Sequence, residues 1–378
     1  MSLRQLSLTE RVGQLFMVGF EGREVSSDLA DWLSTYSWGG VIIFGRNVDS
    51  PAQLLRLIQD LQSLAQRRYQ RPLLVAVDQE GGRVSRLKVP FTPFPSAATL
   101  GHTGSERLVY DVGHAMAREL RAVGINMDMA PVLDVLTNPG NTVIGDRAFG
   151  SHAGAVARLG TAFIQGMRAA GVLTVGKHFP GHGDTVLDSH VALPVCERTA
   201  TQLHACELLP FRAAIAAGIE AIMTAHVIYP TWDAQHPATL SPTILTEILR
   251  EAMGFTGVIV TDDLGMAAVA ETLPWQEIPL RALGAGADLL LICHDRGRQE
   301  GAYTRVLDAA RSGELPEVVL NQAVARVQRL QSRLHSGLQS DASLVPLTCI
   351  GSAVHRAFVE TVRAQHAEVD SKGDSHGT

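Results

Sequence analysis

Short apolar runs recur along most of the chain, and longer segments with helical periodicity lie between them. Eight runs have the length of a strand buried on both faces: Met17–Phe20, Gly40–Phe44, Leu73–Val77, Ile125–Met129, Val172–Gly176, Ile219–Thr224, Val258–Thr261 and Leu289–Cys293. The helical segments include Pro51–Gln66, Ser105–Val123, Ala153–Ala170, Thr199–Ala217 and Thr243–Met253. An alternation of strand and helix that repeats eight times predicts an α/β protein with a single (β/α)8 TIM barrel.

The two ends of this pattern set the domain bounds. The capping-box sequence Ser7-Leu8-Thr9-Glu10 predicts that a helix begins there, and Leu320–Leu334 is the last predicted barrel helix. We therefore assign residues 1–337 to one TIM-barrel domain. The alternative is an open, doubly wound sheet. Its dinucleotide-binding form is less favoured, because no Gly-x-Gly-x-x-Gly turn follows a predicted strand.

Residues 338–378 form a short C-terminal tail in which the pattern loosens. The tail contains one predicted helix, Ala353–Ala367. The polar stretch Asp370–Thr378 follows it, and we expect this stretch to be disordered. The tail is thus predicted to be helical and partly disordered.

Composition narrows the classes of function. The chain has 378 residues, 46% of them hydrophobic, which is enough for one large domain with a substantial core. A net charge of −6 and the lack of a basic amphipathic stretch argue against nucleic acid and membrane-surface partners. The N-terminus lacks the apolar core of a signal peptide, and no apolar run approaches the ~20 residues that span a bilayer. The four cysteines form no Cys-x-x-Cys pair, so we expect reduced thiols in a cytoplasmic protein.

Polar and charged residues directly follow several predicted strands, which is where the active site of a TIM barrel forms. The strand ends lead into Asp78–Arg83, Lys177-His178, His226 and Asp262-Asp263. Any one of these sets has a simpler reading as a helix cap or a loop charge. Four sets that carry acidic, basic and cationic groups to the same end of the barrel favour an active site.

Asp262 follows the buried run Val258–Thr261 directly. A carboxylate at the tip of a buried strand is held rigidly and is partly desolvated, which suits a nucleophile. The simpler reading is that Asp262 or Asp263 caps the next helix. Both readings can hold together, with Asp262 reactive and Asp263 structural, because neighbouring residues at a strand end point in different directions.

The segment Lys177–His190 concentrates three histidines, two aspartates and a lysine, together with one proline and two glycines. The proline and glycines exclude a regular helix, so the segment is predicted to be a loop that folds over the barrel mouth. One interpretation is a zinc site. We favour a zinc site less, because the spacing matches no helical His-x-x-x-His pair and because the positive charge of Lys177 beside the dication would be unfavourable. The other interpretation is a histidine acid/base that a carboxylate orients. Asp188 and His190 fit this role, since residues i and i+2 of an extended segment share a face.

The same loop raises two further expectations. Phe179–Leu193 should be mobile without a ligand, because its glycines and irregular apolar pattern give it few anchors. Asp184 is the next candidate for the acid if His190 does not take that role.

These residues also carry a resemblance to a known family. Lys177–His190 resembles the loop signature of family 3 glycoside hydrolases, in the β-N-acetylglucosaminidase branch that serves bacterial cell-wall recycling. Gly257–Gly265 is similar to the nucleophile motif of that family. Val77–Arg86 and Ile144–Gly150 are similar to two further segments, and the resemblance extends from about Leu6 to about Leu334.

The resemblance implies a role for each site residue. Asp262 would attack the sugar, and Asp188 and His190 would form the acid/base dyad. Five residues would hold the hydroxyls and ring substituents of the terminal sugar: Asp78, Arg86, Arg147, Lys177 and His178. The implied enzyme is a retaining exo-β-N-acetylglucosaminidase that works through a glycosyl-Asp intermediate and needs no metal or organic cofactor. Its substrate would be a small carbohydrate, GlcNAc linked to 1,6-anhydro-MurNAc peptides in the cytoplasm, and we expect a monomer.

The tail departs from part of the family. Some members continue after the barrel into an α/β sandwich domain, and His355–Phe358 resembles the start of that domain. We therefore expect residues 338–378 to be a remnant of a second domain.

Three other functions stay open at this stage. A phosphorylase is one, because a histidine repels an incoming phosphate less than a carboxylate does. A metal-dependent TIM-barrel hydrolase is another. A non-catalytic sugar-binding barrel would lack the nucleophile or the dyad, and this sequence has candidates for both.

Overall fold

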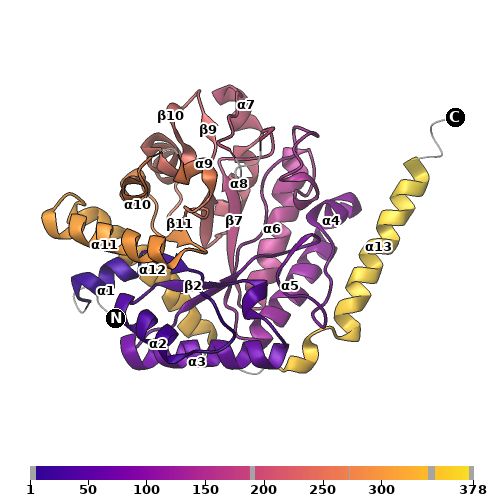
Figure 1. Cartoon of the computed structure of the whole chain (residues 1–378). Coiled ribbons are helices and arrows are strands. Elements are labelled where there is room, and N and C mark those ends of the chain that lie inside the picture. Colours follow the sequence, from indigo (N-terminus) through magenta and orange to yellow (C-terminus); the bar gives the residue numbers. More distant parts are fainter. Residues whose placement is uncertain (1–5, 188–191, 272, 339–344, 374–378) are drawn as a thin grey trace.

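Eight parallel strands form a barrel at the centre of the molecule (Figure 1). The computed structural model describes residues 6–187, 192–271, 273–338 and 345–373. In chain order the strands are β1 (Phe16–Val18), β2 (Gly40–Ile43), β3 (Leu74–Val77), β6 (Met127–Asp128), β7 (Leu173–Phe179), β8 (Ala221–Thr224), β11 (Val258–Val260) and β12 (Leu290–Ile292). From β1 to β11 each strand pairs with the next, and β12 pairs with β1. A parallel bridge between Val260 of β11 and Leu289, just before β12, closes the ring. The predicted (β/α)8 barrel is confirmed.

All eight predicted strands are present, and β7 differs in a way that concerns the site. The sequence placed Lys177 and His178 after the strand, but β7 continues to Phe179. The prediction failed because polar side chains at a barrel mouth interrupt the apolar pattern while the backbone ladder goes on, as Ala225 N donates to Phe179 O.

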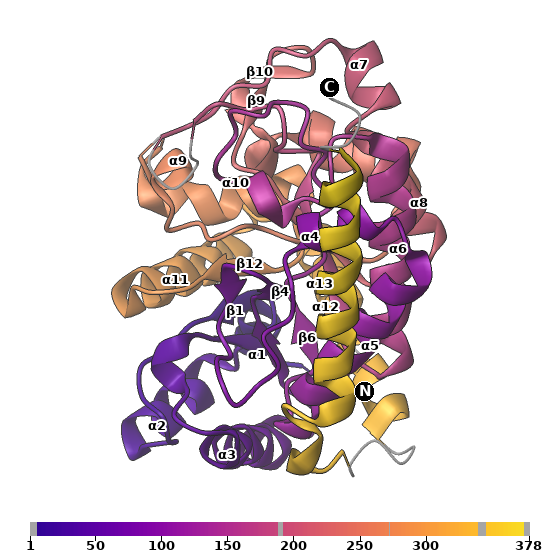
Figure 2. The same cartoon turned by 90° about the vertical axis from the view of Figure 1, so that its right-hand side faces the viewer.

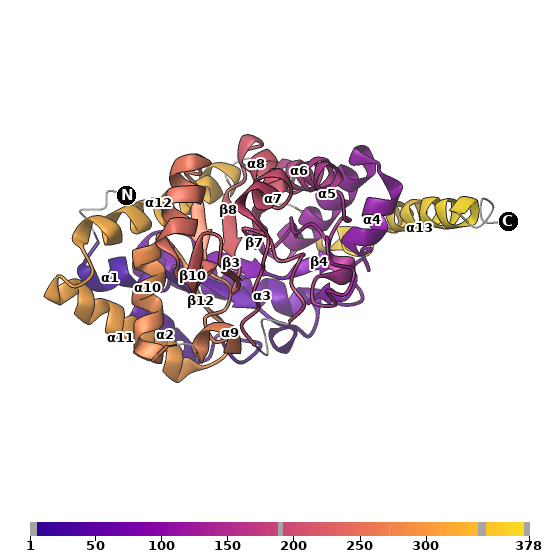
Figure 3. The same cartoon turned by 90° about the horizontal axis from the view of Figure 1, so that it is seen from above.

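Helices surround the barrel, as the view from above shows (Figure 3). Those beside the strands are α2 (Ser27–Tyr36), α3 (Pro51–Tyr69), α5 (Glu106–Ala122), α6 (Ala153–Ala169), α8 (Leu208–Ala216), η5 (Thr243–Ala252), α10 (Ile278–Ala285), α11 (Arg296–Ser312) and α12 (Glu317–Leu338). The first helix, α1 (Leu8–Gly13), has the predicted capping box between Ser7 and Glu10.

The helix predicted at Thr199–Ala217 is two helices, α7 (Ala200–Ala205) and α8. Pro210 lies in the first turn of α8, where its missing N–H costs no helical hydrogen bond. A proline is tolerated at a helix start and not in an interior, so the chain begins a new helix before it.

Two concentric apolar layers hold the barrel together. The inner layer fills the barrel with side chains from the strands, among them Met17, Ile42, Leu74 and Met127. The outer layer lies between strands and helices. Three residues of α12 also join the inner layer: Val327, Leu330 and Leu334. Leu330 lies beside residues that precede β8 and β11 at the N-terminal end of the barrel, so α12 covers this end.

The described part of the tail packs on the barrel. After the short helix η8 (Leu347–Cys349), α13 (Ala353–Gly373) runs beside α4 (Ala97–Thr103) and α5 (Figure 2). The helix continues past Asp370, where the sequence predicted disorder to begin, so that part of the prediction is wrong. The assignment of residues 338–378 to a remnant domain stays a prediction. Among the described residues, no helix is long and apolar enough to cross a membrane.

Candidate active site

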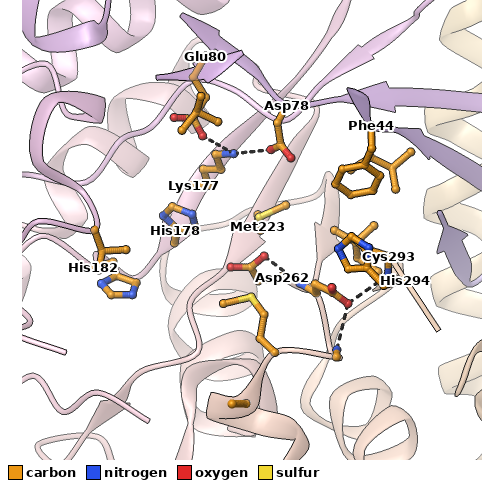
Figure 4. A pocket seen from close by; sticks show the side chains of 18 of the residues that line it. Phe44, Asp78, Glu80, Lys177, His178, His182, Met223, Asp262, Cys293 and His294 are labelled. Atoms are coloured by element: carbon orange, nitrogen blue, oxygen red, sulfur yellow. Dashed lines mark hydrogen bonds and ion pairs between the residues drawn. The ribbon is translucent and has the colours of Figure 1, made fainter. Parts of the chain in front are cut away.

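A cavity of about 860 Å³ opens at the C-terminal ends of the strands. Six residues that the sequence singled out line it together: Asp78, Arg86, Arg147, Lys177, His178 and Asp262. Figure 4 shows how four of these and several neighbours face the space. Asp188 and His190, the predicted dyad, lie outside the described residues.

A buried ion network forms one wall of the cavity. Lys177 Nζ in β7 lies 2.9 Å from Asp78 Oδ1 and 2.7 Å from Glu80 Oε1. Glu80, in the hairpin strand β4 (Gln79–Gly81), also accepts two 2.8 Å hydrogen bonds from the guanidinium of Arg147. Burial raises the pKa of Glu80, but Lys177 and Arg147 outweigh burial and hold the pKa at about 2. The carboxylates in turn raise the pKa of Lys177 against its burial. All three groups are therefore charged.

Asp78 and Arg86 leave part of their hydrogen-bonding capacity open. The Arg86 guanidinium contacts Asp78 Oδ2 only at 3.4 Å, and its buried Nε has no partner among the described residues. A polyhydroxylated ligand offers donors and acceptors to groups of this kind.

Asp128 lies at the end of β6, below this wall, and is fully buried. Its Oδ1 accepts a hydrogen bond from the Gln79 amide, and burial raises its pKa well above the ordinary value. Burial therefore disfavours the ionised form of Asp128.

Asp134 holds the two described histidines of the loop motif. Its buried carboxylate accepts hydrogen bonds from His178 Nδ1 at 2.7 Å, from the His178 amide and from the His182 amide. Burial tends to raise the pKa of Asp134, but His178 and the hydrogen bonds lower it. His178 Nε2 remains at the cavity, 3.5 Å from Arg147 Nη2. The sequence missed Asp134, although the apolar run Met129–Val135 around it was a usable signal.

The His182 ring packs against the His178 ring, with 5.8 Å between the ring centroids. Burial first, and then the neighbouring His178, lower the pKa of His182 to about 4, so its ring is neutral near pH 7.

Asp262 lies just beyond β11 and lines the cavity. Its Oδ1 accepts a 2.8 Å hydrogen bond from the Asp263 amide, and no hydrogen bond from a described residue reaches Oδ2. Burial acts to raise the pKa of Asp262, but His226, His178 and the Asp263 amide bring it below its usual value. The carboxylate is thus ionised and has one oxygen available to a ligand.

Asp263 is engaged with the backbone instead. Its Oδ1 accepts hydrogen bonds from the amides of Gly265 and Cys293, at 3.0 and 3.1 Å. These bonds tie the end of β11 to the end of β12 and fix the position of the neighbouring Asp262.

His226 supports the same strand end from below. It is fully buried, its Nε2 lies 3.0 Å from the carbonyl of Asp263, and its Nδ1 lies 2.7 Å from Thr239 Oγ1. A carbonyl oxygen only accepts, so Nε2 carries a proton and donates to Asp263. The single hydroxyl proton of Thr239 has two acceptors within reach, His226 Nδ1 and the Ala225 carbonyl at 3.0 Å. Thr239 Oγ1 can accept from Thr224, 2.8 Å away. Burial lowers the pKa of His226, in keeping with a neutral ring. Sequence reasoning found His226 but not its partners.

The mobility expected for Phe179–Leu193 rested on a lack of anchors, and residues 179–183 have anchors. Residues 179–183 are buried, Tyr229 donates to the Gly181 carbonyl at 2.7 Å, and Asn141 donates to the His182 carbonyl at 2.8 Å. A Cβ on Gly183 would lie 1.8 Å from the Val135 carbonyl, so only glycine allows this close approach. The anchors come from distant parts of the chain, which a local pattern does not reveal.

Asp184 also has partners of its own. It accepts a 2.9 Å hydrogen bond from Thr137 and lies 3.8 Å from Arg198. Among the described residues, no three His, Cys, Asp or Glu side chains are grouped to hold a metal ion.

Replacing Glu80 by Gln should make folding stability less sensitive to acid. Because the pKa of Glu80 is about 2 in the folded state and 4.5 ordinarily, its stabilisation is present above pH 4.5 and is lost as the pH falls toward 2. Between pH 5 and pH 3 the wild type should lose about 2 kcal/mol more unfolding free energy than Glu80→Gln. Urea denaturation at both pH values measures this difference. The exposed Glu360→Gln should behave as the wild type, and equal losses in wild type and Glu80→Gln would contradict the ion network.

The chain is similar to known proteins over most of its length. Residues 7–330 match the model of the glycosyl hydrolase family 3 N-terminal domain. β-Hexosaminidase A of Pseudoalteromonas piscicida is 34% identical over 409 aligned residues, covering 97% of this chain and 68% of that protein. The structure of a family 3 β-N-acetylglucosaminidase from Paenibacillus sp. str. FPU-7 is similar with a TM-score of 0.90 and 41% identity, covering 96% of this chain and 69% of that one. NagZ from Neisseria gonorrhoeae, in complex with N-trifluoroacetyl-D-glucosamine, has a TM-score of 0.74 and 32% identity, covering 93% and 98%. The chain belongs to glycoside hydrolase family 3, as a β-N-acetylglucosaminidase.

Proposed function

We propose that the protein is a retaining exo-β-N-acetylglucosaminidase in which Asp262 is the nucleophile. The observation that carries this proposal is the state of Asp262. It is an ionised carboxylate at a strand end, it has one oxygen free of hydrogen bonds from described residues, and it shares a cavity with a wall of paired cations and anions. A retaining glycosidase requires such a carboxylate next to the anomeric carbon.

The reaction proceeds in two displacements. In the first, Asp262 Oδ2 forms a bond to the anomeric carbon as the glycosidic bond breaks, and His190 gives its proton to the leaving oxygen. In the second, His190 takes a proton from a water molecule, whose oxygen displaces Asp262 and restores the free carboxylate. An imidazole has an ordinary pKa of about 6.5, so it serves as acid and base near neutral pH without a large shift. Asp188 would orient the ring and stabilise its protonated form.

The terminal sugar would bind against the ion network. Asp78 and Arg86 have unused hydrogen-bonding capacity, and Lys177, Arg147 and His178 present donors or acceptors to the same cavity. The structure of the NagZ relative with N-trifluoroacetyl-D-glucosamine supports a GlcNAc-shaped ligand here. We extend this to the natural substrate, terminal β-linked GlcNAc on 1,6-anhydro-MurNAc peptides in the cytoplasm, on the resemblance to the cell-wall-recycling branch.

Asp262→Ala should lower turnover of a chromogenic β-GlcNAc glycoside on the order of 10³-fold or more, because the covalent step loses its nucleophile. The fold should persist, as circular dichroism would show. A 2-fluoro or 5-fluoro sugar probe should label Asp262 in the wild type. Labelling of Asp263 instead would contradict the assignment.

The same assay distinguishes hydrolysis from phosphorolysis. With phosphate present, the product should still be free GlcNAc. A sugar 1-phosphate as the main product would identify a phosphorylase and would leave the role of Asp262 intact.

Thr239→Val should lower kcat about 10-fold with little change in KM, because the His226 ring loses its hydrogen-bond partner at Nδ1 and the strand end that carries Asp262 shifts. Thr239→Ser keeps the hydroxyl and should stay near the wild type. Steady-state kinetics of the two variants, with thermal melts beside them, provide the test. A lower melting temperature at unchanged kcat would mean that the hydrogen-bond chain serves stability alone.

His190→Ala should slow substrates with poor leaving groups far more than activated aryl glycosides, which hardly need protonation. Asp188→Ala should show a milder form of this pattern, since the imidazole stays but loses its orienting partner. Rates over a series of aryl glycosides measure the dependence on leaving-group pKa. Equal losses across the series in His190→Ala would mean that His190 only binds the sugar.

A further inference from the structure

The C-terminal segment 346–365 is fastened to the barrel through one buried carboxylate. Glu119 of α5 is 2% exposed. Its side chain accepts hydrogen bonds from the Gly351 amide at 2.9 Å and from His355 Nδ1 at 2.8 Å. It also accepts from the amide and the hydroxyl of Thr92. A buried carboxylate with four donors is strongly constrained, so Glu119 joins the C-terminal segment to the loop around Thr92.

The loop around Thr92 is continuous with the part of the chain that forms the buried ion network of the cavity. It begins after Arg86, and Gly351 lies so close to it that a Cβ on Gly351 would be 2.3 Å from the Pro90 carbonyl. The loop ends at the start of α4, where the Phe94 carbonyl accepts a hydrogen bond from the Gly82 amide of the Glu80 hairpin. The C-terminal segment thus packs on the back of the loop that connects Arg86 to α4.

Helix α4 connects the C-terminal segment to the site, because it lies between α13 on one side and the Glu80 hairpin and the Arg147 turn on the other. Its N-terminal end lies against the hairpin, where a Cβ on Gly82 would be 2.7 Å from Ser96 Cβ. A Cβ on Gly101, near its other end, would be 1.8 Å from the Phe149 carbonyl, two residues beyond the turn η3 (Gly145–Arg147). On its outer side α4 packs against α13 (Figure 2).

We propose that the segment 346–365 is a positioning element for substrate binding. It holds the Arg86 loop and α4 in place, and α4 holds the Glu80 hairpin against the turn that carries Arg147. The Glu80–Arg147 pair, with 2.8 Å bonds, depends on the relative placement of these two parts of the chain. The anchoring side chains are His355, Val359 and Val362, which share one buried face of α13. This inference rests on the proposed function, because it takes the ion network as the sugar-binding wall.

Two substitutions in the full-length protein loosen the segment to different degrees. His355→Ala removes one bond to Glu119. Gly351→Val is harsher, since the residue has a φ of +60° and its Cβ would meet the Pro90 carbonyl. Both should raise KM for the chromogenic β-GlcNAc glycoside and the inhibition constant of free GlcNAc about 3- to 10-fold, with kcat within about twofold of the wild type.

Two controls separate positioning from stability. Arg356→Ala, on the exposed face of the same helix, should leave both constants unchanged. Val306→Ala removes buried volume from α11, on the opposite side of the barrel from α13 (Figure 1). It should lower the melting temperature without raising KM.

The outcomes are distinct. If His355→Ala lowers the melting temperature as Val306→Ala does, while KM and the GlcNAc inhibition constant stay at wild-type values, the segment is only a stabiliser and the inference is wrong. If the wild type itself does not release GlcNAc from the glycoside, the proposed function fails instead. A rise in KM for His355→Ala but not for Val306→Ala supports the positioning role.

Discussion

Buried charge is the constraint on which the rest of the site depends. A TIM barrel brings the ends of eight strands to one small region, and side chains there leave most of their water behind. Removing a single partner from a buried ion pair typically costs about 3–5 kcal/mol. Lys177, Glu80 and Arg147 therefore have to stay together, and the turns and hairpins around the barrel mouth are placed so that they do. Neutralisation is mutual, which is why Glu80 and Lys177 remain charged despite burial.

Backbone amides help to stabilise the carboxylates that form no ion pair with a lysine or an arginine. Asp134, Asp262 and Asp263 each accept at least one hydrogen bond from a main-chain N–H. Such bonds stabilise the ionised form and fix the side chain at once, because the donor belongs to a strand end or a tight loop. The positions of these carboxylates are thus fixed by the main chain around them. His226 helps to fix the main chain next to Asp262, because its Nε2 lies 3.0 Å from the Asp263 carbonyl.

Local pattern was sufficient for the fold, because each buried parallel strand is a continuous apolar run with a helix after it. The same rule located Asp262, Lys177 and Asp78, since a residue just beyond such a run must lie at the barrel mouth. It did not locate Asp134, which follows an irregular stretch after β6, nor the partners of His226. Those depend on contacts between residues far apart in the chain. The anchors of Phe179–Thr185 and the packing of α13 on α4 were missed for this reason too.

The charged groups on the wall of the ion network have a consequence for the electric field across the cavity. Three cationic groups, Lys177, Arg147 and Arg86, line this wall against two anionic ones, Asp78 and Glu80. Asp262, across the cavity from this wall, carries a negative charge. A sugar between them lies in a field that draws positive charge toward Asp262 and away from the wall. The anomeric carbon gains positive charge in an oxocarbenium-like transition state, so the fixed charges favour that transition state over the bound sugar.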